Sequence, residues 1–225
     1  MAFSTGNFSE ADRRRVAQAI QDGESKTSAE IVPVIARSSG RYDRPEDIVG
    51  LWLAIIGIIV VWYIFPSSKI ESGSWDTAEP VWELVAFLAV TVVGFVLGAF
   101  LATQIGWLRR LFTPAKQMRE EVFGRARQVF FDNRVYRTAG ASGVLLYVSQ
   151  YERMAAVIAD QSIIDKLGQP QIDQTCAEFT RLLSERTAID ALCETARSLG
   201  QRLSGVLPRA QDDVNELSDA LVVLD

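Results

Sequence analysis

The chain has 225 residues, enough for one domain of roughly 100 to 150 residues with added elements but not for two independent enzymatic domains. Its net charge of −5 argues against nucleic-acid binding, and the absence of histidine excludes His-based triads and HExxH zinc sites. The composition is 48% hydrophobic on average, but it includes two uncharged blocks within a charged remainder.

A helix and a strand are predicted before the first block. Ser9 is a typical N-cap with Asp12 three residues later, and an apolar stripe then continues to Gly23. Residues 30–36, EIVPVIA, follow as a strand. Because Pro33 has no N–H to donate, we expect an edge strand or a local irregularity. A lone strand is not stable, so its partners must lie beyond the uncharged blocks.

The two uncharged blocks, residues 48–68 and 84–108, predict a transmembrane helical hairpin. The first would span about 31 Å as a helix, and the second is long enough to cross with some tilt. Basic residues precede the first block and follow the second, whereas the loop between the blocks has Lys69 as its one basic residue. By the positive-inside rule, we expect a multi-pass protein of the bacterial inner membrane with both termini cytoplasmic. No cleavable signal peptide is expected, because no apolar core precedes the first charges.

Small residues recur every four positions along the second block: Gly94, Gly98, Ala102 and Gly106. This spacing lets helix backbones approach closely in lipid. It fits packing between the two spans of one chain, or self-association with a second copy, or chance, and the pattern alone does not choose.

Basic residues follow the second block at Arg109, Arg110 and Lys116. Since they must lie near the membrane surface, we expect them to contact anionic lipid headgroups. The expected partners are therefore the lipid bilayer and either another membrane protein or further copies of the chain.

The second half of the chain predicts further helices around a strand hairpin. In order these are a helix from Thr113 to about Arg137, strands at 143–149 and 154–159, and helices at about 172–184 and 188–206. The short link between the strands makes them antiparallel. The acidic tail ends in an apolar segment, residues 221–224, that can dock on the domain or stay loose.

The two cysteines, Cys176 and Cys193, fall on the apolar faces of the last two predicted helices. Buried free thiols in a reducing compartment are the favoured interpretation, and a disulfide or redox pair is the alternative.

The resulting fold class is α/β, a small mixed sheet covered by helices and interrupted by a two-helix hairpin. The expected parts are an N-terminal helix and strand, the hairpin, the rest of the domain and an acidic C-terminal tail: residues 1–47, 48–108, 109–209 and 210–225.

Four segments carry a resemblance to a known family: FSEADRRRVAQAI, KTSAEIVPVIAR, GVLLYVSQYERMAAVIAD and the late NELSD. In this order they resemble the TPM domain family, in the bacterial membrane-anchored branch with a hairpin inside the domain. The resemblance covers about residues 8–209 and implies a small sheet sandwiched between helices.

For activity the resemblance implies two alternatives. Some TPM domains outside this branch are acid phosphatases or calcium binders, and others are assembly or accessory factors of membrane complexes, including photosystem repair in chloroplasts. The acidic branch has Asp-Asn-Gly before its central strand, where this chain has Ala141, Ser142 and Gly143. The carboxylate is missing, so the family's catalysis is not carried over.

Three acidic residues, Glu30, Glu152 and Asp160, are the candidates for a polar site, because hard cations and phosphoryl chemistry need converging carboxylates. Solvated or capping roles are favoured for them. Glu152 beside Arg153 is interpreted as an exposed ion pair, and Asp160 as the cap of the following turn. No catalytic residue, metal ligand or cofactor is predicted.

Two functional hypotheses follow. The first is a membrane-anchored cytoplasmic domain that serves as a non-enzymatic interaction or assembly module for a membrane protein complex. The alternative is a metal-dependent phosphoester hydrolase with an altered acidic site. The missing carboxylate at Ala141 and the lack of histidine favour the first.

Overall fold

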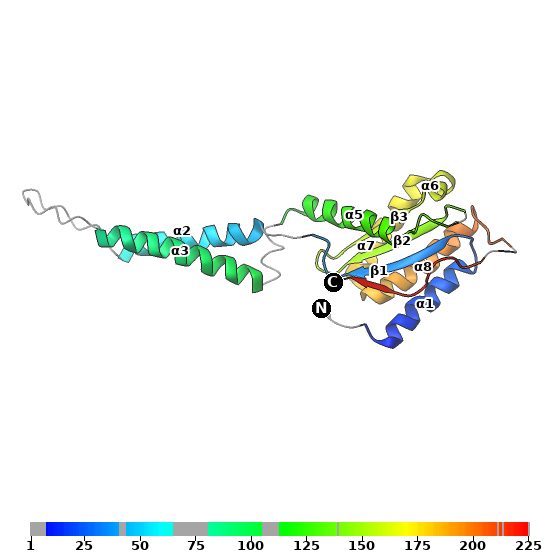
Figure 1. Ribbon diagram of the computed structural model, residues 1–225, viewed down its shortest axis with the longest axis horizontal. Helices are drawn as coiled ribbons and strands as arrows, with labels where there is room; N and C mark the ends of the chain where they lie inside the picture. The colour runs from blue at the N-terminus through cyan, green and yellow to red at the C-terminus, as the bar shows by residue number, and fades with distance from the viewer. Residues whose placement is uncertain are drawn as a thin grey trace, which may run out of the picture. The chain divides into compact units, whose positions relative to one another are not determined.

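The computed structural model describes residues 8–40, 44–64, 81–104, 113–138, 140–210, 212 and 214–224. The chain divides into two compact units (Figure 1): Met1–Gly40 together with Lys116–Asp225, and the intervening Arg41–Ala115. The first unit is an α/β domain and the second is a helical hairpin. The α/β domain is thus built from two separate stretches of sequence.

The hairpin unit consists of α2 (Arg44–Ile64) and α3 (Val81–Gln104). Stretches of 19 and 21 residues within them have mean hydropathies of 2.3 and 2.7, so both helices are long and apolar enough to cross a membrane. Ile59, Val96 and Phe100 each expose more than half of their surface, which suits lipid better than water. The predicted spans continue to residues 68 and 108, and these ends lie outside the described residues.

The two hairpin helices pack through small residues. A Cβ atom added at Gly98 would lie 2.7 Å from the Cα of Gly50, and one added at Gly94 would lie 3.0 Å from the α2 backbone. Ala102 is fully buried, while Gly106 lies outside the described residues. Within one chain, therefore, the small residues bring α2 and α3 into backbone contact.

Gly98→Val is expected to weaken the contact between α2 and α3, because the branched side chain would overlap the α2 backbone. All tryptophans lie between residues 52 and 107, so their fluorescence reports on this unit alone. Unfolding in SDS should show a loss of about 1–3 kcal/mol. Val96→Leu, on the exposed surface, is the control. Equal stability of the two variants would mean that the helices do not depend on this contact.

The sheet of the α/β unit is mixed and joins strands from both sides of the hairpin. β1 pairs in parallel with β2 and with β4, and β2 pairs antiparallel with β3, which gives the order β3-β2-β1-β4. The strands are β1 (Glu30–Ala36), β2 (Gly143–Ser149), β3 (Met154–Ala159) and β4 (Val222–Leu224). This confirms the predicted fold class and the β2–β3 hairpin.

Pro33 lies in an internal strand, so the first of the two alternatives, an edge strand, does not hold. The N–H of Glu30 donates to Ser142 on the β2 side, and the N–H of Arg37 donates to Leu224 on the β4 side. By alternation, position 33 faces the β4 side, where pairing begins only at Val34. The proline therefore removes no bond from the β1–β2 ladder.

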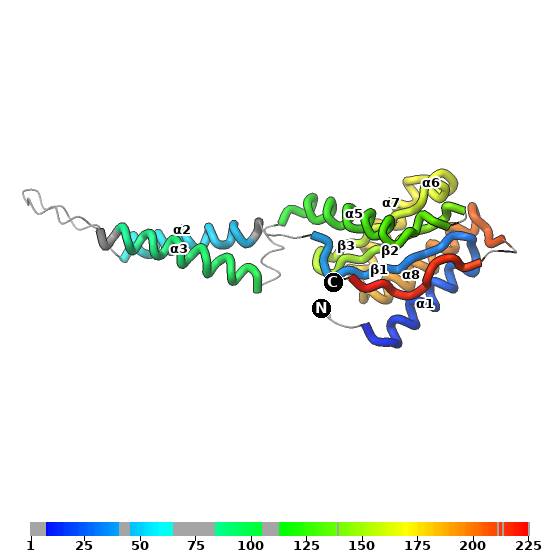
Figure 2. Tube along the Cα trace, viewed as in Figure 1, coloured from blue at the N-terminus to red at the C-terminus, as the bar shows by residue number. Residues whose placement is uncertain are grey.

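Helices cover both faces of the sheet (Figures 1 and 2). On one face α1 (Glu10–Glu24), α7 (Gln169–Glu185) and α8 (Ala188–Ser204) bury Ile31, Ile35 and Leu146. On the other face α5 (Ala115–Asp132) buries Val34 and Tyr147. The two central strands, β1 and β2, are buried on both sides, which explains their nearly continuous apolar sequences.

Several details differ from the sequence expectations. The helix expected to reach Arg137 ends at Asp132, and a short helix, α6 (Gln161–Leu167), precedes α7. The apolar end of the expected acidic tail forms β4 and completes the sheet. Cys193 is buried and Cys176 half-buried, and both are free thiols.

Candidate functional site

The outer edge of β3 is unpaired among the described strands, because β3 is the last strand on its side of the sheet. The N–H of Asp160 donates to the carbonyl of Gly143 over 2.9 Å, and this bond fixes the alternation of the β2–β3 ladder. It follows that the backbone groups of Ala155, Val157 and Ala159 point away from β2. Such an edge offers donors and acceptors to another extended chain.

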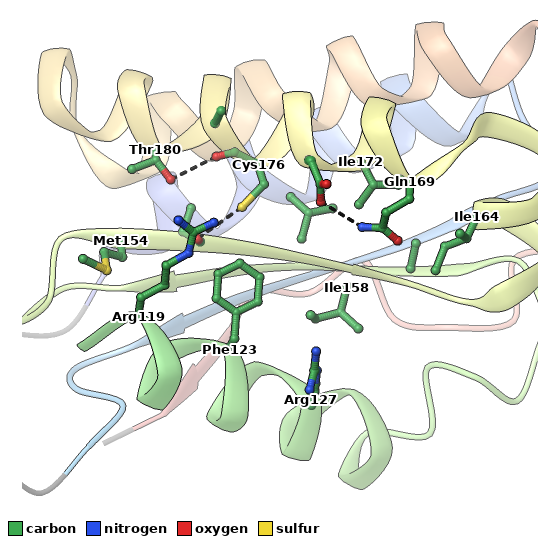
Figure 3. A pocket seen from close by; sticks show the side chains of 15 residues that line it. Arg119, Phe123, Arg127, Met154, Ile158, Ile164, Gln169, Ile172, Cys176 and Thr180 are labelled. Carbon is green, nitrogen blue, oxygen red and sulfur yellow. Dashed lines mark hydrogen bonds between the residues drawn. The ribbon is translucent and has the colours of Figure 1, made fainter. Parts of the chain in front are cut away.

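A groove runs along this edge, with α5 forming one wall and α7 the other (Figure 3). Its volume is about 570 Å³, within the rough range of 300–1,000 Å³ that is common for ligand sites. The apolar lining comes from four elements: Phe123 on α5, Ile158 on β3, Ile164 on α6 and Ile172 on α7. The groove therefore combines an apolar base with an unpaired strand.

Two arginines border the groove on the α5 side. Arg119 and Arg127 flank Phe123 at intervals of four residues, so the three side chains lie along one side of the helix, as Figure 3 shows. The Arg119 guanidinium lies 5.6 Å from the centre of the Phe123 ring. Both arginines are exposed, and neither forms an ion pair with a carboxylate in the described part of the chain. The α5 rim is therefore positively charged.

Cys176 lies in the α7 wall beside the open edge. Its thiol donates to the carbonyl of Ala155 over 3.4 Å, a weak bond. Burial raises the pKa of the Cys176 thiol, and the N–H of Val157 and the charge of Arg119 only partly oppose this rise. The neutral Cys176 thiol thus covers the middle of the β3 edge but is bound to it only weakly.

The candidate residue Glu30 is buried at the start of β1. Its carboxylate oxygens accept hydrogen bonds from the backbone N–H groups of Glu216 and Leu217, both over 3.3 Å. Beside it, the carboxyl group of Glu24 accepts the N–H of Ile31 over 2.7 Å. Glu30 therefore holds the C-terminal segment that leads into β4.

Glu24 makes the stability of the α/β unit depend on pH. Burial, together with the nearby charges of Glu30 and Asp219, raises the Glu24 pKa from 4.5 to about 8, although the bond from Ile31 opposes the rise. The folded state then keeps a proton that the unfolded chain releases. The resulting stabilisation is complete below pH 4.5 and is lost as the pH rises through about 8.

The free energy of unfolding is therefore expected to fall by about 1–3 kcal/mol between about pH 5 and pH 8.5. This range is smaller than the full pKa shift of Glu24 implies, because solvent reaches the half-buried side chain and screens its interactions. Pulse proteolysis in urea at a series of pH values measures it. Glu24→Gln should flatten the pH dependence, whereas Glu10→Gln, exposed on the same helix, should leave it unchanged. A flat profile in the unmodified chain would contradict the raised pKa.

Asp160 and Glu30 flank Gly143 from opposite sides, since Glu30 pairs with Gly143 in one ladder and Asp160 bonds to it in the other. Their backbones are thus about 10 Å apart, two strand spacings. A Cβ added at Gly143 would lie 2.0 Å from the Val135 carbonyl oxygen, which fills the space between the two acids. Asp160 is the N-cap of α6, with one oxygen accepting the N–H of Gln161 and the other buried without a hydrogen-bond partner among the described residues. The structure does not join the two acids into one site.

The neighbouring segment, residues 141–143, packs through neutral groups. The Ser142 hydroxyl donates to the Ser28 carbonyl over 2.9 Å, and the Ser142 N–H donates to the Thr138 hydroxyl over 2.8 Å. Across the residues that the structure describes, no group of three or more Asp, Glu or Cys side chains is placed to hold a metal ion.

Glu152 is fully buried, so the expectation of an exposed ion pair with its neighbour in the turn is wrong. Its carboxylate accepts the N–H groups of Ser39, over 2.9 Å, and Gly40, over 3.3 Å, as well as the hydroxyl of Ser149. The Ser39 hydroxyl also bonds to Tyr147 over 2.9 Å. The turn between β2 and β3, which contains Glu152, folds over the end of β1. There the N–H groups of Ser39 and Gly40 need a buried acceptor. Glu152 thus fixes residues 39–40, which precede the helical hairpin in the sequence.

Of the three basic residues expected near lipid headgroups, only Lys116 is among the described residues. Its side chain is exposed in the first turn of α5, 3.9 Å from Glu120. Arg109 and Arg110 lie outside the described residues.

These features define an α/β domain with a small mixed sheet, interrupted by two helices that are long and apolar enough to span a membrane. No family model and no curated protein matches the chain. Among solved structures, the chain is similar to the BA42 protein of the psychrophilic bacterium Bizionia argentinensis, determined by NMR. The similarity covers 99% of each chain at 16% identity, with a TM-score of 0.57. At this identity it shows the fold alone.

Proposed function

We propose that the chain is a membrane-anchored accessory protein of the TPM domain family, whose α/β domain binds a protein partner in a membrane complex and is not an enzyme. The observation that carries the proposal is the groove beside β3. Among the described residues, it joins an unpaired strand edge, an apolar base and two arginines without carboxylate partners. Protein partners commonly use such edges, because the backbone supplies affinity and the flanking side chains supply specificity.

The proposed location is the bacterial inner membrane, with both termini and the α/β domain in the cytoplasm. The exposed apolar surfaces of α2 and α3 and the excess of arginine outside the hairpin support it. In a Cys176→Ser, Cys193→Ala background, a thiol introduced at Ser72 should be labelled in intact cells. Thiols at Ser4 and Gln211 should react only after the membrane is breached, and the reverse pattern would contradict the orientation.

Site-specific photo-cross-linking in cells tests the accessory role. A photoreactive residue at Gln169, on the exposed rim of the groove, should yield an adduct with a membrane protein. The same residue at Arg14, exposed on α1, is the control and should not. Absence of any adduct from Gln169 would contradict the proposal. So would phosphomonoester hydrolysis that is lost in an Asp160→Ala, Glu30→Ala double variant.

A further inference from the structure

We propose that the groove binds an extended acidic segment of the partner protein, which adds a further strand at the open edge of β3. This inference rests on the proposed function and specifies the chemistry of the partner. Three observations carry it: the unpaired backbone of β3, the spacing of the groove side chains on α5, and the two arginines that have no carboxylate partner in the described part of the chain.

The spacing on α5 matches that of a strand. Arg119 and Arg127 are eight residues apart, which is about 12 Å along a helix, with Phe123 halfway between them. In an extended chain, residues i and i+4 lie on one face and are about 13 Å apart, with i+2 between them. A segment with acidic residues at i and i+4 and an apolar residue at i+2 therefore places a carboxylate at each arginine and an apolar side chain at Phe123.

The backbone of such a segment has partners on β3. The N–H and C=O groups of Val157 and Ala159 point toward the groove and bond to no other described strand. At the Ala155 carbonyl and the Val157 N–H, the incoming chain displaces the Cys176 thiol, which contacts both groups through weak hydrogen bonds. Side chains on the other face of the segment then meet Ile172 on α7.

A second copy of this chain fits the groove less well. The edge strands that a second copy offers among the described residues are β3 and β4, and their residues, MAAVIA and VVL, carry no charge. Pairing of two β3 strands would leave Arg119 and Arg127 without carboxylates. The charge of the α5 rim thus favours a partner segment with acidic residues on its α5 face, whereas Asp173 on the α7 wall favours neutral residues on the other face.

Fluorescence anisotropy with the full chain in phosphatidylcholine nanodiscs tests the inference. The probe is the labelled peptide Thr-Glu-Val-Ile-Val-Glu-Thr, and the matched peptide Thr-Val-Glu-Ile-Glu-Val-Thr has the same composition but brings its carboxylates to about 7 Å. The first peptide should bind saturably and the second about tenfold more weakly. Arg119→Glu and Arg127→Glu should each weaken binding by about fivefold to tenfold, whereas Arg14→Glu, on α1, should not change it.

A second readout is the alkylation of Cys176, which should slow when the peptide occupies the groove. Because Cys193 is buried, it contributes little background. A peptide that is N-methylated along one edge cannot bond to β3 and should neither bind nor protect the thiol. Alanine at both arginines keeps the surface neutral and should weaken binding less than the charge reversals.

Three results would overturn the inference: no saturable binding up to about 1 mM, equal binding by the Arg119→Glu, Arg127→Glu double variant, or equal binding of the N-methylated peptide. Arginine-dependent binding of anionic vesicles in place of the peptide would also overturn it. If the cellular adduct from Gln169 persists in the double variant, the accessory function stands and the acidic strand does not. If the unmodified chain forms no adduct, the accessory function itself fails.

Discussion

A fragment comprising residues 116–225 is expected not to fold by itself. β1 is internal to the sheet and pairs with β2 along seven residues, and α1 packs on α8 over the same face. Removal of residues 1–40 would expose Val144, Leu146 and Leu199, which are all fully buried. At about 25 cal/mol per Å² the loss is several kcal/mol, comparable with a typical net stability of about 5–15 kcal/mol.

Circular dichroism and limited proteolysis measure this outcome. The matched control replaces residues 41–114 with a flexible Gly/Ser linker that keeps both stretches of the α/β unit, and this protein should be soluble and melt cooperatively. Supplying residues 1–40 as a separate chain should partly restore protease resistance to the fragment. A cooperatively melting 116–225 fragment that is indifferent to residues 1–40 would show that the N-terminal stretch is an appendage.

Gly200→Ala is expected to destabilise the α/β unit by about 2–4 kcal/mol, an effect at the upper end for a single added methyl group. At the crossing of α1 and α8, a Cβ on Gly200 would lie 2.5 Å from both the Cα and the carbonyl oxygen of Gly23. These are backbone atoms, so the helices themselves would have to separate. Urea unfolding by pulse proteolysis measures the change.

Gly124→Ala is the matched control for this substitution. Gly124 is also helical, but an added Cβ would meet no atom of the described residues within 4 Å, apart from its chain neighbours and its own helix backbone. Alanine is favoured over glycine in a helix, so this variant should be more stable by about 0.5–1 kcal/mol. If the two variants shift stability in the same direction, the close approach of α1 and α8 is not the reason that alanine is unfavourable at position 200.

The elements that could be predicted are those whose signals are local. Two long uncharged blocks suffice to indicate membrane-length helices, and the apolar runs at 143–149 and 154–159 with a short link suffice for a hairpin. The pairing of β1 across the insertion followed from the rule that a single strand needs a partner. For Pro33 the sequence left an edge strand and a local irregularity open, because the rule for proline in sheets depends on which side of the strand the residue faces, and that requires the register.

The features that were missed depend on distant contacts. Glu152 is buried because Ser39, 113 residues earlier in the chain, donates to it. β4 has only three residues, and Glu30 holds the segment before it from 187 positions away. The groove requires α5 and α7 to lie on either side of β3, so the i, i+4 spacing of Arg119, Phe123 and Arg127 had no meaning before the fold was known. That spacing on a helix beside an edge strand is nevertheless a signal that can be searched for in other sequences.

The order of synthesis gives the insertion between β1 and β2 a further consequence. Each β1 residue pairs with a residue made roughly 110 positions later, so at about 5–20 residues per second the ribosome needs roughly 6–22 s to deliver the partner strand. On the proposed membrane location, the hairpin can already enter the bilayer throughout that interval, while β1 has an unpaired backbone and exposed apolar side chains. Nascent chains of this protein are therefore expected to depend on a chaperone near the insertion machinery, and a pause placed between the hairpin and β2 should increase aggregation.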